Sequence, residues 1–431
     1  MRIVILGGGI TGLVAADKLS RQNHAVVIFE KESSLGGLAS GFFHNGWKWP
    51  LEKTYHHMFS NDSEILNYIK EIGFDKAIYK TPLTSSLYSV ENNYRIFPVD
   101  TPQDLLKLPL LGLPEKIRTG IVVLLLKLSP FLDYYQEITS IELLRKSMGE
   151  RSWKIIWEPL MRGKFGKYAE NILASFIWAR INKRTKKLAY IEGGFQGLVD
   201  FLETLNKKQE VVIKKNTTVN QVEKSNDKFI INTNTGEREV FDGVISTLPT
   251  PVLVNVADKI FPQHYQQQLK SIKYLFASNL IIESEKPLFE KEYWINVCDR
   301  GLPILALVQH TNFIDKKYYN NKNILYVANY FDEKSPLLKM DTQSAAKYFS
   351  PYLTQINSKF HIPNSTFYFK APYAQPIVDK DFIKNKPDYL TPVKNFIIAN
   401  LDMSYPYDRG TNFSVKMGKR AAEILNSLNH R

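Results

Sequence analysis

Cysteine is nearly absent from this chain, since Cys298 is the single one among 431 residues. One thiol cannot close an internal disulfide, and it cannot supply a cysteine-based metal cluster. The adjacent pair His56 and His57 has no further histidine or acidic cluster beside it in the sequence, which argues against a metal site there as well. We therefore expect a protein of a reducing compartment that holds no metal.

The sequence also shows neither a signal peptide nor a membrane-spanning run. A strand-forming run begins at residue 3, which leaves no room for a secretory leader, so a cytoplasmic location is expected. The Leu-rich stretch 105–132, LLKLPLLGLPEKIRTGIVVLLLKLSPFL, is interrupted by proline and charge, whereas a spanning helix takes about 20 mostly apolar residues. Two interpretations stay open for it: a helical subdomain packed internally, or a peripheral contact with the cytoplasmic face of a membrane.

Negative charge is in the minority, with 43 Asp and Glu against 56 Lys and Arg and a net charge of +13. This excess indicates either anionic partners, such as a phosphorylated substrate or an acidic membrane surface, or simply a solvated basic surface. Nucleic acid is not expected, because no RNA-recognition, zinc-finger or basic-helix signature is present.

What the chain does have is a glycine pattern near its first residues, MRIVILGGGITGLVAADKLS. The spacing Gly7-x-Gly9-x-x-Gly12 follows a short apolar run and precedes apolar residues at helical spacing. In a dinucleotide-binding unit these glycines form a tight turn, admit a pyrophosphate close to the backbone and let helix and strand pack closely. A second predicted strand, 25–29, ends at Glu30, whose carboxylate suits a ribose 2′-hydroxyl and argues against NADP.

A second glycine pair, Gly36-Gly37 in EKESSLGGLAS, follows Glu30 after a few residues. Together with YIEGGFQGLVDFL, VISTLP and RGTNFSVKMGKRAAEIL, these motifs resemble the superfamily of amine oxidases, protoporphyrinogen oxidases and phytoene desaturases over most of the chain. The resemblance implies FAD as the cofactor. Many oxidases of the group carry Arg after the glycine pair, where this chain has Leu38.

The resemblance implies an α/β, two-dinucleotide-binding-domain flavoprotein whose domains are interleaved along the chain. Residues 1–75, 188–254 and 391–431 would form a Rossmann-type FAD-binding domain. Residues 76–187 would form the helical part, and 255–390 the mixed-sheet part, of the substrate domain.

The sequence pattern predicts local elements within these divisions. Helices are predicted over 63–73 and about 411–428, with an amphipathic segment at 138–148, and strands over 323–329 and in NFIIANLD. Residues 80–184 are mostly helical in pattern, and residues 188–250 read as short strands.

The resemblance also implies which residues hold the cofactor. The pyrophosphate region would be held by Gly7, Gly9, Thr11 and Gly12, and the adenosine ribose by Glu30. Gly36, Gly37 and Ser40 would line the approach to the flavin, while the backbone of Val219 would face the adenine and Thr247 would lie under the nucleotide. The flavin end would be formed by Asp402, Gly410, Thr411, Asn412, Ser414 and Val415. There the last helix would direct its N-terminus at the flavin and stabilise its anionic reduced form.

Three residues are candidates for catalysis. His56 or His57 could serve as a general base or as a hydrogen-bond partner of the flavin, because imidazole titrates near neutral pH. Arg409 could reinforce the positive end of the last helix. The competing interpretations are a turn-stabilising histidine and a surface salt bridge.

The function expected from these features is an FAD-dependent oxidoreductase that removes hydride from a lipophilic substrate, such as a prenyl chain, a sterol-like ring or a tetrapyrrole. The alternative is a flavin sugar-nucleotide mutase, because the His segment, RGKFGK and SYPYDRG also resemble UDP-galactopyranose mutase, and arginines suit a diphosphate. A non-catalytic FAD-binding protein is a third possibility. Candidate substrate-binding residues are Arg162, Arg180, Tyr330, Tyr373 and Tyr405.

Overall fold

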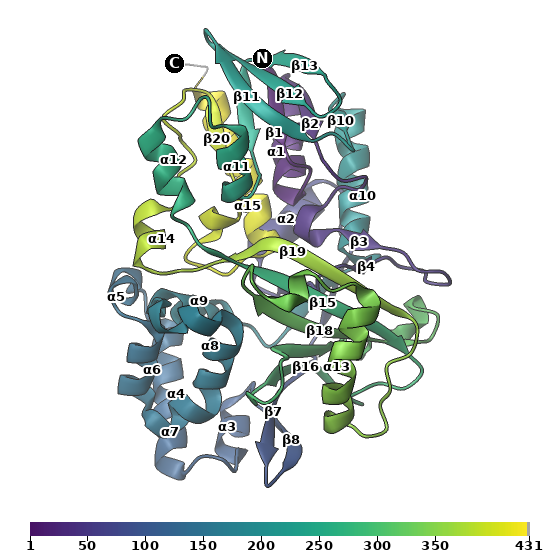
Figure 1. Ribbon diagram of the computed structural model, residues 1–431, viewed down its shortest axis with the longest axis vertical. Helices are drawn as coiled ribbons and strands as arrows, with labels where there is room; N and C mark the ends of the chain where they lie inside the picture. Colours follow the sequence, from purple (N-terminus) through teal and green to yellow (C-terminus); the bar gives the residue numbers. More distant parts are fainter. Residues whose placement is uncertain (429–431) are drawn as a thin grey trace.

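The structure, a computed structural model, describes residues 1–428, and one half of it is built on a five-stranded parallel sheet (Figure 1). Alternate residues of the first strand enter two different cores: Ile3 and Ile5 pack on one face, and Val4 and Leu6 pack on the other. Burial on both faces explains why this strand is continuously apolar rather than alternating. In spatial order the strands are β10 (Val212–Lys214), β2 (Ala25–Phe29), β1 (Arg2–Leu6), β14 (Gly243–Ser246) and β20 (Phe396–Ile398).

Helices cover one face of the parallel sheet, and a small sheet with two helices covers the other. The first set comprises α1 (Ile10–Ser20), α2 (Ser63–Glu71), α10 (Gly194–Lys208) and α15 (Thr411–Ser427). The second comprises the antiparallel strands β11 (Val219–Ser225), β12 (Lys228–Thr233) and β13 (Arg238–Phe241), with α11 (Thr250–Val256) and α12 (Gln263–Lys270). A Cβ added to Gly418 would lie 2.5 Å from the Thr11 carbonyl oxygen, so glycine lets α15 pack directly on α1.

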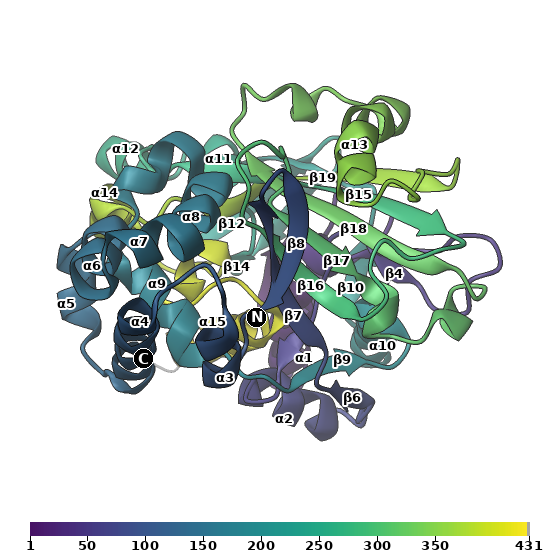
Figure 2. The same cartoon turned by 90° about the horizontal axis from the view of Figure 1, so that it is seen from below.

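A seven-stranded mixed sheet forms much of the other half of the molecule (Figure 2). Neighbouring strands are antiparallel except β16 and β7, which run parallel, and α13 (Thr342–Ile356) packs against the sheet. The spatial order is β19 (Thr366–Pro376), β15 (Tyr274–Ser284), β18 (Asn323–Phe331), β17 (Ala306–Gln309), β16 (Glu292–Val297), β7 (Leu83–Val90) and β8 (Asn93–Pro98).

A group of helices lies beside the mixed sheet (Figures 1 and 2). It comprises α3 (Pro102–Lys107), α4 (Leu113–Leu128), α5 (Leu132–Glu137), α6 (Ser140–Met148), α7 (Glu150–Ser152), α8 (Glu158–Phe165) and α9 (Ala174–Lys183). The short helix α14 (Lys380–Asn385) precedes β20, and five short strands pair in two further sheets: β3 (Gly41–Phe42), β4 (Leu51–Glu52), β5 (Met58–Phe59), β6 (Ala77–Lys80) and β9 (Leu188–Ile191).

The α/β fold class predicted from the sequence is confirmed, as are the strand at 25–29 and the helices beginning at residues 63 and 411. Two predictions were wrong. Residues 83–98 form the hairpin of β7 and β8 rather than helix, because β7 pairs with β16, about 200 residues later in the chain. Residues 194–208 form α10 rather than strands, since Phe195, Leu198 and Leu202 place one buried stripe at helical spacing.

Candidate functional site

The first glycine pattern forms a tight turn between β1 and α1. The Gly7 N–H donates to the Phe29 carbonyl at 2.9 Å, and Gly7 has a φ of +104°. A Cβ on Gly12 would lie 2.2 Å from the Gly7 carbonyl oxygen, so no larger residue fits there. Thr11 lies in the first turn of α1, where the backbone N–H groups have no partner within the helix. The turn therefore presents free donors at the positive end of a helix.

Gly9 is different, because the fold itself does not require a glycine there. Its φ of −72° is open to any residue, and a Cβ would meet its nearest neighbours, Gly36 and Gly37, only at 4.0 Å. Space is thus left over the helix N-terminus where a side chain would otherwise stand. This is the fit expected for a bound pyrophosphate.

The second glycine pair closes against this turn. The Gly36 N–H donates to the Gly8 carbonyl at 2.9 Å, and both Gly36 and Gly37 have positive φ, +113° and +57°. A Cβ on Gly36 would lie 3.0 Å from Cα of Ser40, whose carbonyl accepts from the Lys53 N–H. Two glycine segments about 25 residues apart in the chain therefore form one backbone surface, which we call the glycine cradle (residues 7–12 and 36–40).

Glu30 holds the edge of the glycine cradle. Its Oε2 accepts from the Gly8 N–H at 2.8 Å and its Oε1 accepts from the Glu32 N–H at 2.9 Å, with the residue 8% exposed. The carboxylate retains lone pairs that can accept from a ribose hydroxyl.

Thr247 and Val219 border the cradle from the other strands. The Thr247 hydroxyl donates to the Leu6 carbonyl at 2.9 Å, and a Cβ on Gly7 would lie 2.5 Å from its oxygen. Val219 begins β11, two residues after Thr217, whose N–H donates to the Glu30 carbonyl at 2.9 Å. Thr247 therefore lies next to the turn, and Val219 lies near Glu30.

The first residues of α15 have structural roles within the protein. The Asn412 Oδ1 accepts from the N–H groups of Glu64 and Ile65 and thereby caps α2, and Val415 is fully buried in the core. The Ser414 hydroxyl donates to the Gly410 carbonyl at 3.3 Å. Gly410 and Thr411 stand at the start of α15, where Gly410 is exposed, has extended backbone and has no atom within 4 Å of a built Cβ.

Asp402 is a buried carboxyl group close to this segment. Its Oδ2 accepts from the Thr250 hydroxyl at 2.6 Å and from the Tyr274 hydroxyl at 2.5 Å. Burial raises the pKa of Asp402 to about 6. Its Oδ1 is buried without a hydrogen-bond partner among residues 1–428, so it can still accept a hydrogen bond from a bound group.

His56 and His57 lie between β4 and β5, and both are partly buried among aromatic rings. The His56 Nδ1 is 2.6 Å from the Thr54 carbonyl oxygen, and because a carbonyl can only accept, Nδ1 carries the proton and Nε2 is left as the acceptor. The His57 Nδ1 lies 3.0 Å from the Tyr293 hydroxyl. Burial lowers the pKa of His56 to about 4 and that of His57 to about 3, with a further contribution from Arg184 to the latter. Both rings are therefore neutral at neutral pH.

Charged side chains from three separate segments meet near Tyr330 of β18. Lys164 of α8 lies 3.6 Å from Asp408, and Arg180 of α9 pairs with the same carboxylate. Arg409 donates to the Ala374 carbonyl at 2.7 Å, to the Gln375 side chain at 3.3 Å and to the Tyr330 hydroxyl. We call Lys164, Arg180, Asp408 and Arg409 the cationic cluster.

Burial alone would raise the pKa of the Asp408 carboxyl, but the cations of the cluster together hold that pKa well below its usual range. Arg409 is thus no isolated surface salt bridge, and its guanidinium faces β18 and β19. Tyr55 lies beside the Tyr330 hydroxyl, and Arg409 and Arg180 both act on it electrostatically.

Three of the predicted substrate residues are not in this cluster. Arg162 pairs with Glu158 and Glu170 on the outer side of α8. Tyr373 packs on Tyr274 and Phe276, and Tyr405 packs on Phe382.

Sequence reasoning did not single out Lys164 and Asp408 as members of the site. Signals for both were present, because Lys164 lies in RGKFGK and Asp408 directly precedes Arg409 in SYPYDRG. Nothing in the local sequence, however, says that these segments meet.

Comparison with known proteins was made at the level of both sequence and structure. Residues 10–425 match the sequence profile described as flavin containing amine oxidoreductase. Coproporphyrinogen III oxidase of Staphylococcus aureus is 25% identical over 296 residues, which cover 59% of this chain and 61% of that enzyme, less than two thirds of its length. A 4,4'-diapophytoene desaturase of Staphylococcus haemolyticus is 41% identical over 54 residues, 12% of this chain and 11% of the desaturase.

Solved structures agree over nearly the whole chain. A protein of Exiguobacterium sp. 255-15, assigned provisionally as a protoporphyrinogen oxidase, superposes with a TM-score of 0.77 at 19% identity, covering 100% of this chain and 99% of that one. Cyclohexylamine oxidase of Brevibacterium oxydans IH-35A gives a TM-score of 0.75 at 13% identity, with coverage of 100% and 99%. At these identities the likeness shows the fold.

Proposed function

The chain belongs to the flavin-containing amine oxidoreductase family. On this premise we propose that it is an FAD-dependent oxidoreductase that removes hydride from a lipophilic small molecule. Two relatives are named for coproporphyrinogen III and for diapophytoene, which supports a tetrapyrrole, prenyl or similar apolar substrate. The family match does not favour the sugar-nucleotide mutase alternative.

The space over Gly9 is the observation that carries the cofactor assignment. Of the glycines in the cradle, Gly12 is needed by the fold, whereas Gly9 is needed only if something else occupies its Cβ position. We assign the pyrophosphate to Gly7, Gly9, Thr11 and Gly12, the ribose to Glu30, and the adenine side to Val219 and Thr247. FAD, when bound, accepts the hydride, and the protein supplies its orientation and electrostatics.

At the flavin end, we assign contacts to Gly36, Gly37, Ser40, Asp402, Gly410 and Thr411. Asn412, Ser414 and Val415 would act indirectly, because capping of α2, the bond to Gly410 and core packing fix the start of α15. The free Oδ1 of Asp402 would accept a hydrogen bond from the cofactor.

We assign His56 and His57 to positioning and hydrogen bonding rather than to general base catalysis. A base works best when its pKa lies near the operating pH, and both imidazoles are well below that. The acceptor Nε2 of His56 suits an N–H or O–H group of the bound cofactor or substrate. Arg409, turned toward β18 and β19, would act on the substrate side.

We propose the domain division given by the sequence. Residues 1–75, 188–254 and 391–431 would bind FAD, because every strand of the parallel sheet comes from one of these three stretches. Residues 76–187 and 255–390 would bind the substrate. The final residues, 429–431, lie outside the part of the chain that the structure describes.

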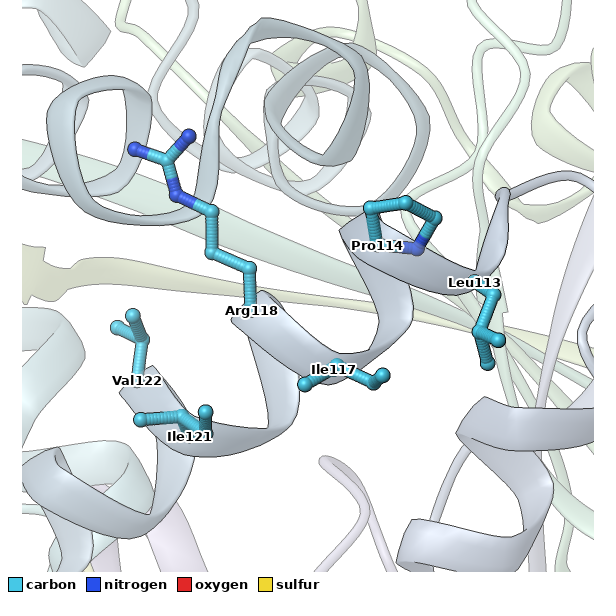
Figure 3. A pocket seen from close by; sticks show the side chains of 6 residues that line it. All are labelled: Leu113, Pro114, Ile117, Arg118, Ile121 and Val122. Atoms are coloured by element: carbon cyan, nitrogen blue, oxygen red, sulfur yellow. The ribbon is translucent and has the colours of Figure 1, made fainter.

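The outer face of α4 would contact a membrane at the cytoplasmic side. Six of its apolar side chains are half or more exposed: Leu113, Ile117, Ile121, Leu124, Leu125 and Leu128. Figure 3 shows three of them together on this helix. Lys127 and Arg118 turn inward onto carbonyl groups at the ends of α9 and α6, so the outer face is mainly apolar. Among residues 1–428, no helix has the length and apolarity needed to cross a bilayer.

The enzyme assignment is tested by the visible absorption spectrum of the purified protein. We expect a yellow protein whose flavin bands bleach when a hydride-donating substrate is added without oxygen and return with an electron acceptor. A protein that stays colourless after incubation with FAD would overturn the assignment. A protein active only while its flavin stays reduced would point to the mutase.

The membrane contact is tested by flotation with vesicles. We expect the protein to float with vesicles and Leu125→Asp to reduce the floating fraction, while Leu390→Asp, at an exposed leucine elsewhere, leaves it unchanged. Wild type that stays out of the lipid fraction at low salt would count against this contact.

A further inference from the structure

The cationic cluster carries more positive charge than its own carboxylate can neutralise. Lys164 and Arg180 both pair with one acid, Asp408, whereas the Arg409 guanidinium donates to a carbonyl, an amide and a phenol and acts on Asp408 electrostatically. Three cations against one anion leave an excess of two charges, counting Lys164 as protonated. An unmatched positive charge is costly away from water unless an anion joins it.

The excess positive charge of the cluster lies between aromatic rings, which shield part of it from water. The Lys164 Nζ lies 4.8 Å from the centre of the Phe176 ring and 5.0 Å from that of Tyr330, and only 10% of its side chain is exposed. The Arg180 side chain is 43% exposed, so the cluster runs from an open rim inward to a nearly dry end. Burial lowers the pKa of Lys164 to about 7, and an added anion would restore its charge.

The cationic cluster also acts electrostatically on His56 and His57, the predicted catalytic histidines. Arg409 contributes to the lowered pKa of His56, and Arg180 to that of His57. His56 and His57 are therefore neutral, as is Tyr55, whose pKa is raised by burial, and the charges that act on all three are those of guanidinium groups. A cationic amine would be repelled from such a place, and an anion would be attracted.

We propose that the cationic cluster binds an anionic oxygen head group, a carboxylate or a phosphate, of the substrate. The proposal rests on the function proposed above and names the chemistry of its substrate: an apolar molecule with an acidic end, and not an amine. Arg180 at the rim and Lys164 inside hold the anion, and Arg409 orients it against Tyr330. Guanidinium groups suit both anions, because their N–H groups match paired oxygens.

The helix that carries Arg180 also connects the cluster to the apolar face of α4. Trp178 of α9 donates to the Ser129 carbonyl just after α4, and Lys127 donates to carbonyls at the end of α9. Two helices joined by these hydrogen bonds thus present an apolar surface and a cation. This arrangement matches an amphiphilic substrate.

Binding of head-group probes to the FAD-loaded protein tests the proposal. Octanoate, octyl phosphate and octylamine share one tail and differ in charge, and calorimetry measures their affinity without relying on the flavin. We expect at least one anionic probe to bind tenfold or more tightly than octylamine, and more weakly as salt is raised. The stronger of the two anions identifies carboxylate or phosphate. Equal or tighter binding of octylamine would overturn the proposal.

Substitutions within the cationic cluster test whether the anionic probe binds there. Arg180→Gln and Lys164→Met should each weaken the anionic probe about tenfold and leave octylamine unchanged, with Arg180→Lys recovering part of the loss. Arg145→Gln, at an exposed arginine paired with Glu150, is the matched control and should change nothing. If the cluster variants lose affinity for FAD instead, the cluster belongs to the cofactor site and the proposal fails. If the protein is colourless but still binds the anions through these residues, the proposed flavin-dependent function is wrong and the anion site stands.

Discussion

The glycine cradle and the cationic cluster are built from different material. The cradle is made of backbone: N–H groups at the start of α1, two glycine turns and one carboxylate that fixes their edge. The cluster is made of side-chain charges on α8, α9 and the loop before α15. Shape dominates in the glycine cradle, where an added side chain either distorts the turn, as at Gly12, or fills the space over the helix N-terminus, as at Gly9. Charge dominates in the cationic cluster, where removing one charged group unbalances the others.

The strongest way to break the cradle is Gly12→Ala. A Cβ there would lie 2.2 Å from a backbone oxygen, so the turn or α1 must shift. We expect a loss of about 3 kcal/mol in the free energy of unfolding, together with loss of FAD binding, measured by denaturant titration and by flavin absorbance. Gly120→Ala in α4, where the new Cβ meets its nearest atom at 3.7 Å, should leave both unchanged or slightly improved.

The cluster is broken by Asp408→Asn. Removing the carboxylate leaves three cations facing one another, and we expect the free energy of unfolding to fall by about 2 kcal/mol at pH 7. The pKa of Asp408 is lowered in the fold, so its stabilising effect is present above the unfolded carboxyl pKa, about 3.9, and disappears as pH falls below that value. The difference between wild type and variant in denaturant titrations should therefore narrow below about pH 4. A constant difference would show that the carboxylate acts through packing rather than charge.

Gly9→Ser distinguishes an effect on cofactor binding from an effect on the stability of the fold. Serine is a favoured residue before a helix, and the backbone here accepts it, so stability without FAD should be kept. The side chain would occupy the pyrophosphate position and weaken FAD binding about tenfold or more, by about 1.4 kcal/mol, measured by equilibrium titration of the apoprotein. Unchanged FAD affinity would mean that the space over Gly9 is not the cofactor site.

The smallest effect is expected for Arg162→Gln. Arg162 was a candidate substrate residue from the sequence, but its ion pairs with Glu158 and Glu170 lie toward solvent. We expect the free energy of unfolding to fall by less than about 0.5 kcal/mol and the affinity for the head-group probes to stay unchanged. A tenfold loss of probe affinity would extend the cluster to this side of α8.

The glycine cradle depends mainly on residues close together in the chain, whereas the cationic cluster depends on contacts between distant segments. This difference explains how much of each could be predicted from the sequence. β1, β2, α1 and the glycine turn were predictable, because their signals lie within about 30 consecutive residues and follow from local sterics. The hairpin of β7 and β8 was not, because β7 is a strand through pairing with β16.

Likewise, Arg180 and Arg409 could be named as cations from the sequence, but not their meeting at Asp408. That meeting depends on the packing of α9 against the loop before α15, and no spacing within the chain encodes it. Asn412 lies in a recognisable motif, but the motif alone does not reveal that its side chain caps a different helix, α2.

Gly418 sets an order of events during synthesis of the protein. Because α15 packs on α1 through this glycine, and β20 adds the edge strand beside β14, the parallel sheet lacks one strand and one covering helix until residue 418 has been synthesised. A nascent chain shortened before that point has the first turn but not the helix that fastens it. The native packing of the glycine cradle is therefore complete only after β20 and α15, the last strand and helix of the described residues, have been made.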